Sequence, residues 1–114
     1  MDVVRAGEVV HVIERRVFAE DVRRHFVGVV EARSKRTLRV KGYLFVYDSS
    51  SGSFMRKPEL RARLIPLDNR VIINILSHGT AAGTISYITG ADGNLQLTDG
   101  ADFGLDISEF SVRE

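Results

Sequence analysis

The chain contains no cysteine and no long apolar run. Without cysteine it has no disulfide framework, no thiolate nucleophile and no thiolate metal site. No apolar segment approaches the roughly 20 residues that a membrane-spanning helix requires, and the first residues lack a basic region followed by an apolar one. These absences predict a cytoplasmic protein that does not bind membranes.

The 114 residues suit one domain, since this length supports one core and does not divide comfortably into two. Apolar residues make up 44% of the chain and charged residues 27%, which is typical of globular proteins. We expect a single β domain over residues 1–114. It would consist of a compact hairpin unit at about 8–77, followed by a C-terminal hairpin and acidic tail at about 84–114.

The net charge of +1 is the sum of a basic first part of the chain and an acidic second part. Residues 1–80 carry 15 Lys or Arg and 9 Asp or Glu, whereas residues 81–114 carry one Arg and six acids, so the two parts are about +6 and −5. One interpretation is a basic surface that binds an anionic partner. The other, which we favour, is that the acidic C-terminal part docks on the basic part, within one molecule or between copies.

Two alternating runs between residues 26 and 47 predict a hairpin whose register can be tested. With residues 34–36 as the loop, one face becomes wholly apolar, whereas a slip of one residue spoils both faces. The other face pairs Glu31 with Arg39, Val29 with Lys41 and Arg33 with Thr37. The apolar face pairs Ala32 with Leu38, Val30 with Val40, Gly28 with Gly42 and Phe26 with Leu44.

Gly28 opposite Gly42 predicts a sharp bend in this hairpin, because glycine weakens a strand unless the backbone must bend or approach closely. Such a bend lets a short sheet curl into a small barrel. A neighbouring aromatic ring packed over the two glycines is the alternative explanation.

A second hairpin is predicted from residues 60–66 and 71–76, with Asp68-Asn69 as its turn. That turn places Leu64 opposite Ile73 and Ala62 opposite Ile75. Residues 71–76 are almost entirely apolar, which indicates a central strand buried on both sides. Asn74 within that run then needs hydrogen-bond partners, and we expect its role to be structural.

The remaining segments add short elements. Residues 48–53 form a loop by composition, Phe54 and Met55 a returning strand, and the Asp92-Gly93 dipeptide a turn between strands at 84–89 and 95–98. Phe18, Val22 and Phe26 stand at helical spacing, although about two turns are marginal without packing. The fold class is therefore mainly β, a small antiparallel barrel or strongly curled sheet of about seven strands, with at most one short helix near residues 18–25.

Residues suited to catalysis or metal binding do not form a recognisable pattern. His11, His25 and His78 lack metal-ligand spacing, and we expect His11 and His25 to be structural. The segment around the glycines at 79 and 83 lacks the lysine and the following hydroxyl residue that bind phosphate groups in a phosphate-binding loop. We predict no catalytic, cofactor-binding or metal-binding residue and no cofactor.

One strand face combines cations with aromatic rings, as single-stranded nucleic-acid binding requires. The alternative is that Tyr43, Phe45 and Tyr47 form a second buried face or a subunit interface. The candidate binding surface consists of Arg39, Lys41, Tyr43, Phe45, Tyr47, Arg61 and Arg63.

A short N-terminal helix, a strongly bent hairpin and a further β pair resemble the order of elements in Sm-like small barrels, which assemble into rings and bind RNA. The resemblance is one of architecture and implies no binding residue.

Three hypotheses of function follow. The first is a non-enzymatic interaction module that forms a homo-oligomer by burying exposed strand faces between copies. The second is a small barrel that binds single-stranded nucleic acid through the candidate surface. The third is an enzyme whose site forms between subunits.

Overall fold

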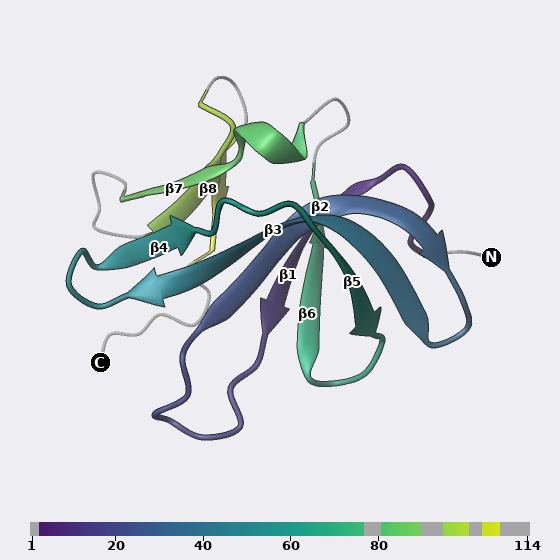
Figure 1. Cartoon of the computed structure of the whole chain (residues 1–114), viewed down its shortest axis with the longest axis horizontal. Helices are drawn as coiled ribbons and strands as arrows, with labels where there is room; N and C mark the ends of the chain where they lie inside the picture. The colour runs from purple at the N-terminus through teal and green to yellow at the C-terminus, as the bar shows by residue number, and fades with distance from the viewer. Residues whose placement is uncertain (1–2, 77–80, 90–94, 101–103, 108–114) are drawn as a thin grey trace.

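The computed structural model describes residues 3–76, 81–89, 95–100 and 104–107, and in them the chain is mainly β and antiparallel, as predicted (Figure 1). Those residues form nine strands and one turn of 3₁₀ helix at Ala82–Thr84. The strands are β1 (Val9–Glu14), β2 (Arg24–Arg33), β3 (Thr37–Asp48), β4 (Ser53–Arg56), β5 (Arg61–Pro66), β6 (Val71–Ile75), β7 (Ser86–Thr89), β8 (Leu95–Thr98) and β9 (Gly104–Asp106).

The first six strands form sheet A, in the order β4-β3-β2-β1-β6, and β5 also pairs with β3. Strand β3 is long enough to hold β5 along its first half and β4 along its second half. The sheet curls strongly, with β6 as one edge and with β4 and β5, which both pair with β3, along the other (Figure 1). It does not close into a barrel, because β5 and β6 do not pair among the described residues, and the strands number nine there rather than about seven.

The central part of the β2–β3 register is confirmed, with Gly28 opposite Gly42, Val30 opposite Val40 and Phe26 opposite Leu44. A Cβ atom on Gly42 would overlap the Val27 carbonyl oxygen and the Cα of Gly28. The atoms closest to the two glycines are thus mostly backbone, so close approach of the two strands explains the pair, and an aromatic ring packed over it does not.

The end of this hairpin differs from the prediction by one residue. Ser34 pairs across the turn, its amide donating to the Thr37 carbonyl at 2.8 Å, so the loop has two residues instead of three. Arg33 therefore faces Leu38, and Ala32 faces Arg39. A β-bulge between Val30 and Ala32 absorbs the extra residue, Glu31, and restores the predicted register beyond it.

The predicted pairing of β5 with β6 is wrong. Asp68-Asn69 does lie in the turn between them, but β5 pairs with β3, which places Leu64 opposite Arg39 and Ala62 opposite Lys41. Strand β6 pairs with β1 alone and is an edge strand of sheet A, not a central one. Val71, Ile72 and Ile73 are half-buried and Ile75 is 47% exposed, as expected for an edge strand.

Two apolar cores lie on opposite faces of sheet A. The first face, inside the curl, carries Val12, Phe26 and Val40 and buries the first core. The second face carries Val27 and Phe45 and packs against sheet B, a three-stranded sheet in the order β7-β8-β9. The predicted pairing of the segments at 84–89 and 95–98 is confirmed, while their turn, residues 90–94, lies outside the described residues.

No helix forms near residues 18–25. Residues 15–23 are a loop between β1 and β2, in which Val17, Phe18 and Val22 are largely exposed, so nothing packs beneath them to stabilise two helical turns. The order of elements that resembles Sm-like barrels therefore lacks its first member. In the described residues no helix is long and apolar enough to cross a membrane.

Candidate functional site

The aromatic part of the predicted surface is mostly core. Phe45 is 2% exposed and its ring lies 5.0 Å from that of Tyr87 in sheet B, while Tyr43 and Tyr47 are half-buried at the edge of the second core. Guanidinium groups cover both tyrosines, with Arg56 4.6 Å from the Tyr43 ring centroid and Arg23 5.5 Å from that of Tyr47. These rings therefore pack as the second buried face that was the alternative to a stacking platform.

The cations of the predicted surface lie on two different faces. Arg39 and Lys41 are exposed on the second face, and Arg39 pairs with Glu31 at 3.1 Å. Arg63 lies opposite Val40, whose side chain faces the first core, and paired residues on neighbouring strands point to the same side. Arg61 shares that orientation and pairs with Glu59 at 3.4 Å. The sheet thus separates Arg61 and Arg63 from Arg39 and Lys41.

Sheet A and sheet B bury a polar cluster between them. The Tyr87 hydroxyl lies 2.7 Å from His25 Nδ1 and 3.2 Å from His11 Nε2, and these two nitrogens are 3.0 Å apart. Asn74 Nδ2 lies 3.2 Å from His11 Nδ1. One consistent assignment has Asn74 donating to His11, His11 Nε2 donating to the tyrosine oxygen, and the hydroxyl donating to His25.

Burial keeps both histidines neutral at pH 7. It lowers the pKa of His11 to about 4, and burial together with the charges of His11 and Arg23 lowers the pKa of His25 to about 3. Burial also raises the pKa of the Tyr87 hydroxyl above its usual range. The cluster is therefore a neutral hydrogen-bonded network, and it gives Asn74 the hydrogen-bond partner that its place in an apolar strand requires.

The described residues bring no three His, Asp or Glu side chains together as a metal site would require. The partners of His11 and His25 among those residues are each other, Tyr87 and Asn74. Neither histidine is hydrogen-bonded there to a serine or threonine that could serve as a nucleophile.

The strongest candidate site is a cavity of about 420 Å³ at one end of the first face, between β5, the starts of β2 and β6, and the loop of residues 15–23. Its apolar lining includes Val12, Phe26, Ile65 and Val71, which belong to the first core or pack against it. Five arginines surround this lining, and we call the cavity with them the arginine cleft: Arg15, Arg16, Arg24, Arg63 and Arg70.

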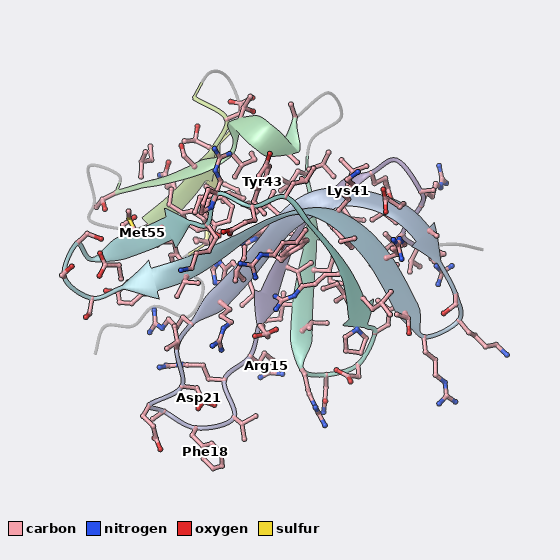
Figure 2. All side chains as sticks on the ribbon, in the orientation of Figure 1. Arg15, Phe18, Asp21, Lys41, Tyr43 and Met55 are labelled. Atoms are coloured by element: carbon pink, nitrogen blue, oxygen red, sulfur yellow. The ribbon has the colours of Figure 1, made fainter. Side chains whose placement is uncertain are left out.

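Hydrogen bonds that involve backbone groups join the walls of the arginine cleft. The Arg15 amide donates to the Arg70 carbonyl at 2.8 Å, and the Arg15 guanidinium donates to the Asn69 carbonyl at 3.0 Å. At the outer end of the loop, Asp21 accepts a hydrogen bond from the Phe18 amide at 3.0 Å. Figure 2 shows Arg15 at the base of this loop and Phe18 at its outer end.

The positive charge of the arginine cleft is not neutralised within the described residues. Two acids, Glu14 and Asp21, line the cavity beside the five arginines, and none of these arginines forms an ion pair with a described carboxylate. The guanidinium of Arg63 lies 5.6 Å from the centroid of the buried Phe26 ring. The cleft therefore offers cationic hydrogen-bond donors around an apolar floor, an arrangement suited to an anion that carries an apolar body.

Of these five arginines, the sequence prediction included only Arg63. The sequence did offer a signal of this cluster of cations. Two pairs of adjacent arginines, Arg15-Arg16 and Arg23-Arg24, flank the short segment between them. The helix expected near residues 18–25 would have pointed Arg23 and Arg24 in different directions and separated them from Arg15 and Arg16.

Comparisons of the chain with protein-family models, with curated proteins and with solved structures gave no match. Function must therefore be argued from the geometry of the arginine cleft.

Proposed function

We propose that the protein is a non-enzymatic binding module for single-stranded nucleic acid and that the arginine cleft is its binding site. The observation that carries the proposal is the group of five arginines, free of ion pairs with described carboxylates, around an apolar cavity. Arginine donates two parallel hydrogen bonds to phosphate oxygens and stacks on flat rings, so both parts of a nucleotide find partners.

Exposed apolar side chains beside the cleft support this ligand. Val17, Phe18 and Val22 are 73%, 62% and 46% exposed on the loop of residues 15–23. Unpaired bases stack on exposed aromatic rings and apolar side chains, whereas a duplex buries its base faces. A single strand therefore uses both the cations and the apolar loop.

Binding of a fluorescent single-stranded oligonucleotide, measured by anisotropy over a salt series, tests the proposal. The variant Arg24→Ala/Arg63→Ala is expected to bind at least about tenfold more weakly at low salt, since charge-assisted hydrogen bonds contribute roughly 1.5–3 kcal/mol each. Its log–log salt slope should fall in magnitude by about 0.7 for each phosphate charge that the two arginines no longer neutralise.

The matched control is Arg39→Ala/Lys41→Ala, which removes two cations from the second face of the sheet. It should bind like the unmodified protein. Loss of affinity in the control alone would place the site on the sequence-predicted surface, and no binding by the unmodified protein at low salt would remove the proposal.

Self-association is a second candidate function, favoured by exposed apolar residues on the unpaired edges of sheet A. Leu64 on β5 is 67% exposed and Ile75 on β6 is 47% exposed, and strand edges of this kind pair with other chains. Light scattering at micromolar concentration should then show an oligomer that Ile75→Lys returns to a monomer. A monomer at every concentration would exclude this function.

A further inference from the structure

The cations of the arginine cleft are concentrated around one cavity. The cavity lining carries five arginines and two acids, a local charge of +3 from 5 − 2. Two cations on the neighbouring strands do not add to this charge: Arg39 lies on the opposite face and pairs with Glu31, and Arg61 pairs with Glu59. The positive charge therefore has its centre at the cavity.

The size of the cleft also fits one unit of a ligand. Its volume of about 420 Å³ falls in the range of small-molecule sites, roughly 300–1,000 Å³. The floor is closed by buried side chains of the first core, among them Val12 and Phe26. A chain cannot thread through such a floor. A chain end fills a cleft of this size with only one flanking segment leaving through its mouth, whereas an internal nucleotide needs room for two.

The charge of the cleft matches a terminal phosphate better than an internal one. An internal phosphodiester carries one negative charge, whereas a phosphomonoester carries about −1.5 to −2 at pH 7 and has three acceptor oxygens. Arg24 and Arg63 both project from the first face above this floor, where two guanidinium groups can donate to one phosphate. Arg63 is half-buried against the Phe26 ring, which lowers its exposure to competing water.

We infer that the arginine cleft binds a phosphomonoester attached to a nucleoside, as found at a phosphorylated end of a single strand or in a free nucleotide. This inference rests on the proposed function and restricts it to strand ends. The terminal phosphate is bound by Arg24 and Arg63, and the attached sugar and base lie against the apolar floor and the loop that carries Val17 and Val22.

The test compares one fluorescent oligonucleotide sequence in three forms: 5′-phosphorylated, 3′-phosphorylated and unphosphorylated. At least one phosphorylated form should bind at least tenfold more tightly than the unphosphorylated form. That difference should vanish in Arg24→Ala/Arg63→Ala and persist in Arg39→Ala/Lys41→Ala. Circular dichroism of each variant establishes that it is folded.

Competition identifies the source of the phosphomonoester. A nucleoside 5′-monophosphate should displace the phosphorylated oligonucleotide, whereas inorganic phosphate at the same concentration should displace it at least tenfold less effectively, because it leaves the apolar floor empty. Displacement by the nucleotide at a concentration close to that of the oligonucleotide identifies the free nucleotide as a sufficient ligand. A much higher required concentration identifies the strand end.

Two results contradict the inference in distinguishable ways. Equal affinity for all three forms, with loss of binding in Arg24→Ala/Arg63→Ala, overturns the restriction to strand ends and leaves the proposed function standing. No binding of any form at low salt overturns the inference and the proposed function together.

Discussion

At Gly28 and Gly42, the backbone of one strand occupies the space where a side chain on the other would lie. The two strands can approach so closely only because neither residue has a Cβ atom. The curl of sheet A depends on this contact, and the curl in turn brings β5 close enough to β1 and β2 to form the arginine cleft.

Substitution Gly42→Ala should destabilise the protein by about 3 kcal/mol, because the added methyl group would overlap the Val27 carbonyl and the strands must move apart. Urea unfolding measures the change. Gly83→Ala is the control, since a Cβ there would meet nothing within 4 Å. Equal stability of the two variants would show that the close approach of β2 and β3 is not needed.

The buried histidines make stability depend on pH. Their pKa values of about 4 and about 3 lie below the unfolded value near 6.5, so the unfolded chain binds more protons as pH falls. The stabilisation is complete above pH 6.5 and decreases progressively as pH falls toward the folded values. Each histidine should cost on the order of 2 kcal/mol between pH 7 and pH 5.

Urea unfolding at pH 7, 6 and 5 measures this loss, in a window above the usual titration of Asp and Glu. Nuclear magnetic resonance of the two imidazole rings provides the direct control, because neither ring should titrate above pH 5 while the protein is folded. An unfolding free energy that does not change from pH 7 to pH 5 would contradict the buried, neutral cluster.

Among the elements, the loop of residues 15–23 contributes little to stability, since its apolar side chains are exposed, and we propose that it contributes to binding. Phe18→Ala should therefore weaken oligonucleotide binding by about tenfold, as expected for one lost stacking contact, and leave the salt dependence unchanged. Its urea midpoint should match that of the unmodified protein. Met55→Ala on β4 removes a similarly exposed apolar side chain and should change neither quantity.

Local patterns predicted the strands well, and their partners less well. The β2–β3 register follows from alternation and from Gly28 opposite Gly42, because a slip would expose the core face. The partner of β5 could not be found in this way, since a plausible turn at Asp68-Asn69 suggests a hairpin with β6 and nothing local encodes the competing edge of β3.

The arginine cleft escaped prediction for the same reason. Arg24 and Arg63 are 39 residues apart in the sequence and line one cavity only because β5 and β2 both pair with β3. The cluster of His11, His25 and Tyr87 likewise needs sheet B to pack on the second face of sheet A. Such groupings depend on three-dimensional packing that no single spacing in the sequence reveals.

At the scale of the whole molecule, the two faces of sheet A have different surroundings. Sheet B covers the part of the second face that carries Val27 and Phe45, and aromatic packing and the buried histidines stabilise the protein there. The first face ends in the arginine cleft, which stays open because β5 and β6 do not pair. The unpaired edges thus leave the entrance through which we propose that an anionic ligand reaches the apolar floor.

The most direct test is an amide ¹⁵N–¹H titration of the protein with a 5′-phosphorylated single-stranded oligonucleotide. Binding at the arginine cleft predicts the largest chemical-shift changes at Arg24, Arg63 and Val71 and in the loop of residues 15–23. Changes confined to Arg39, Lys41 and their neighbours, or no changes at low salt, would contradict it.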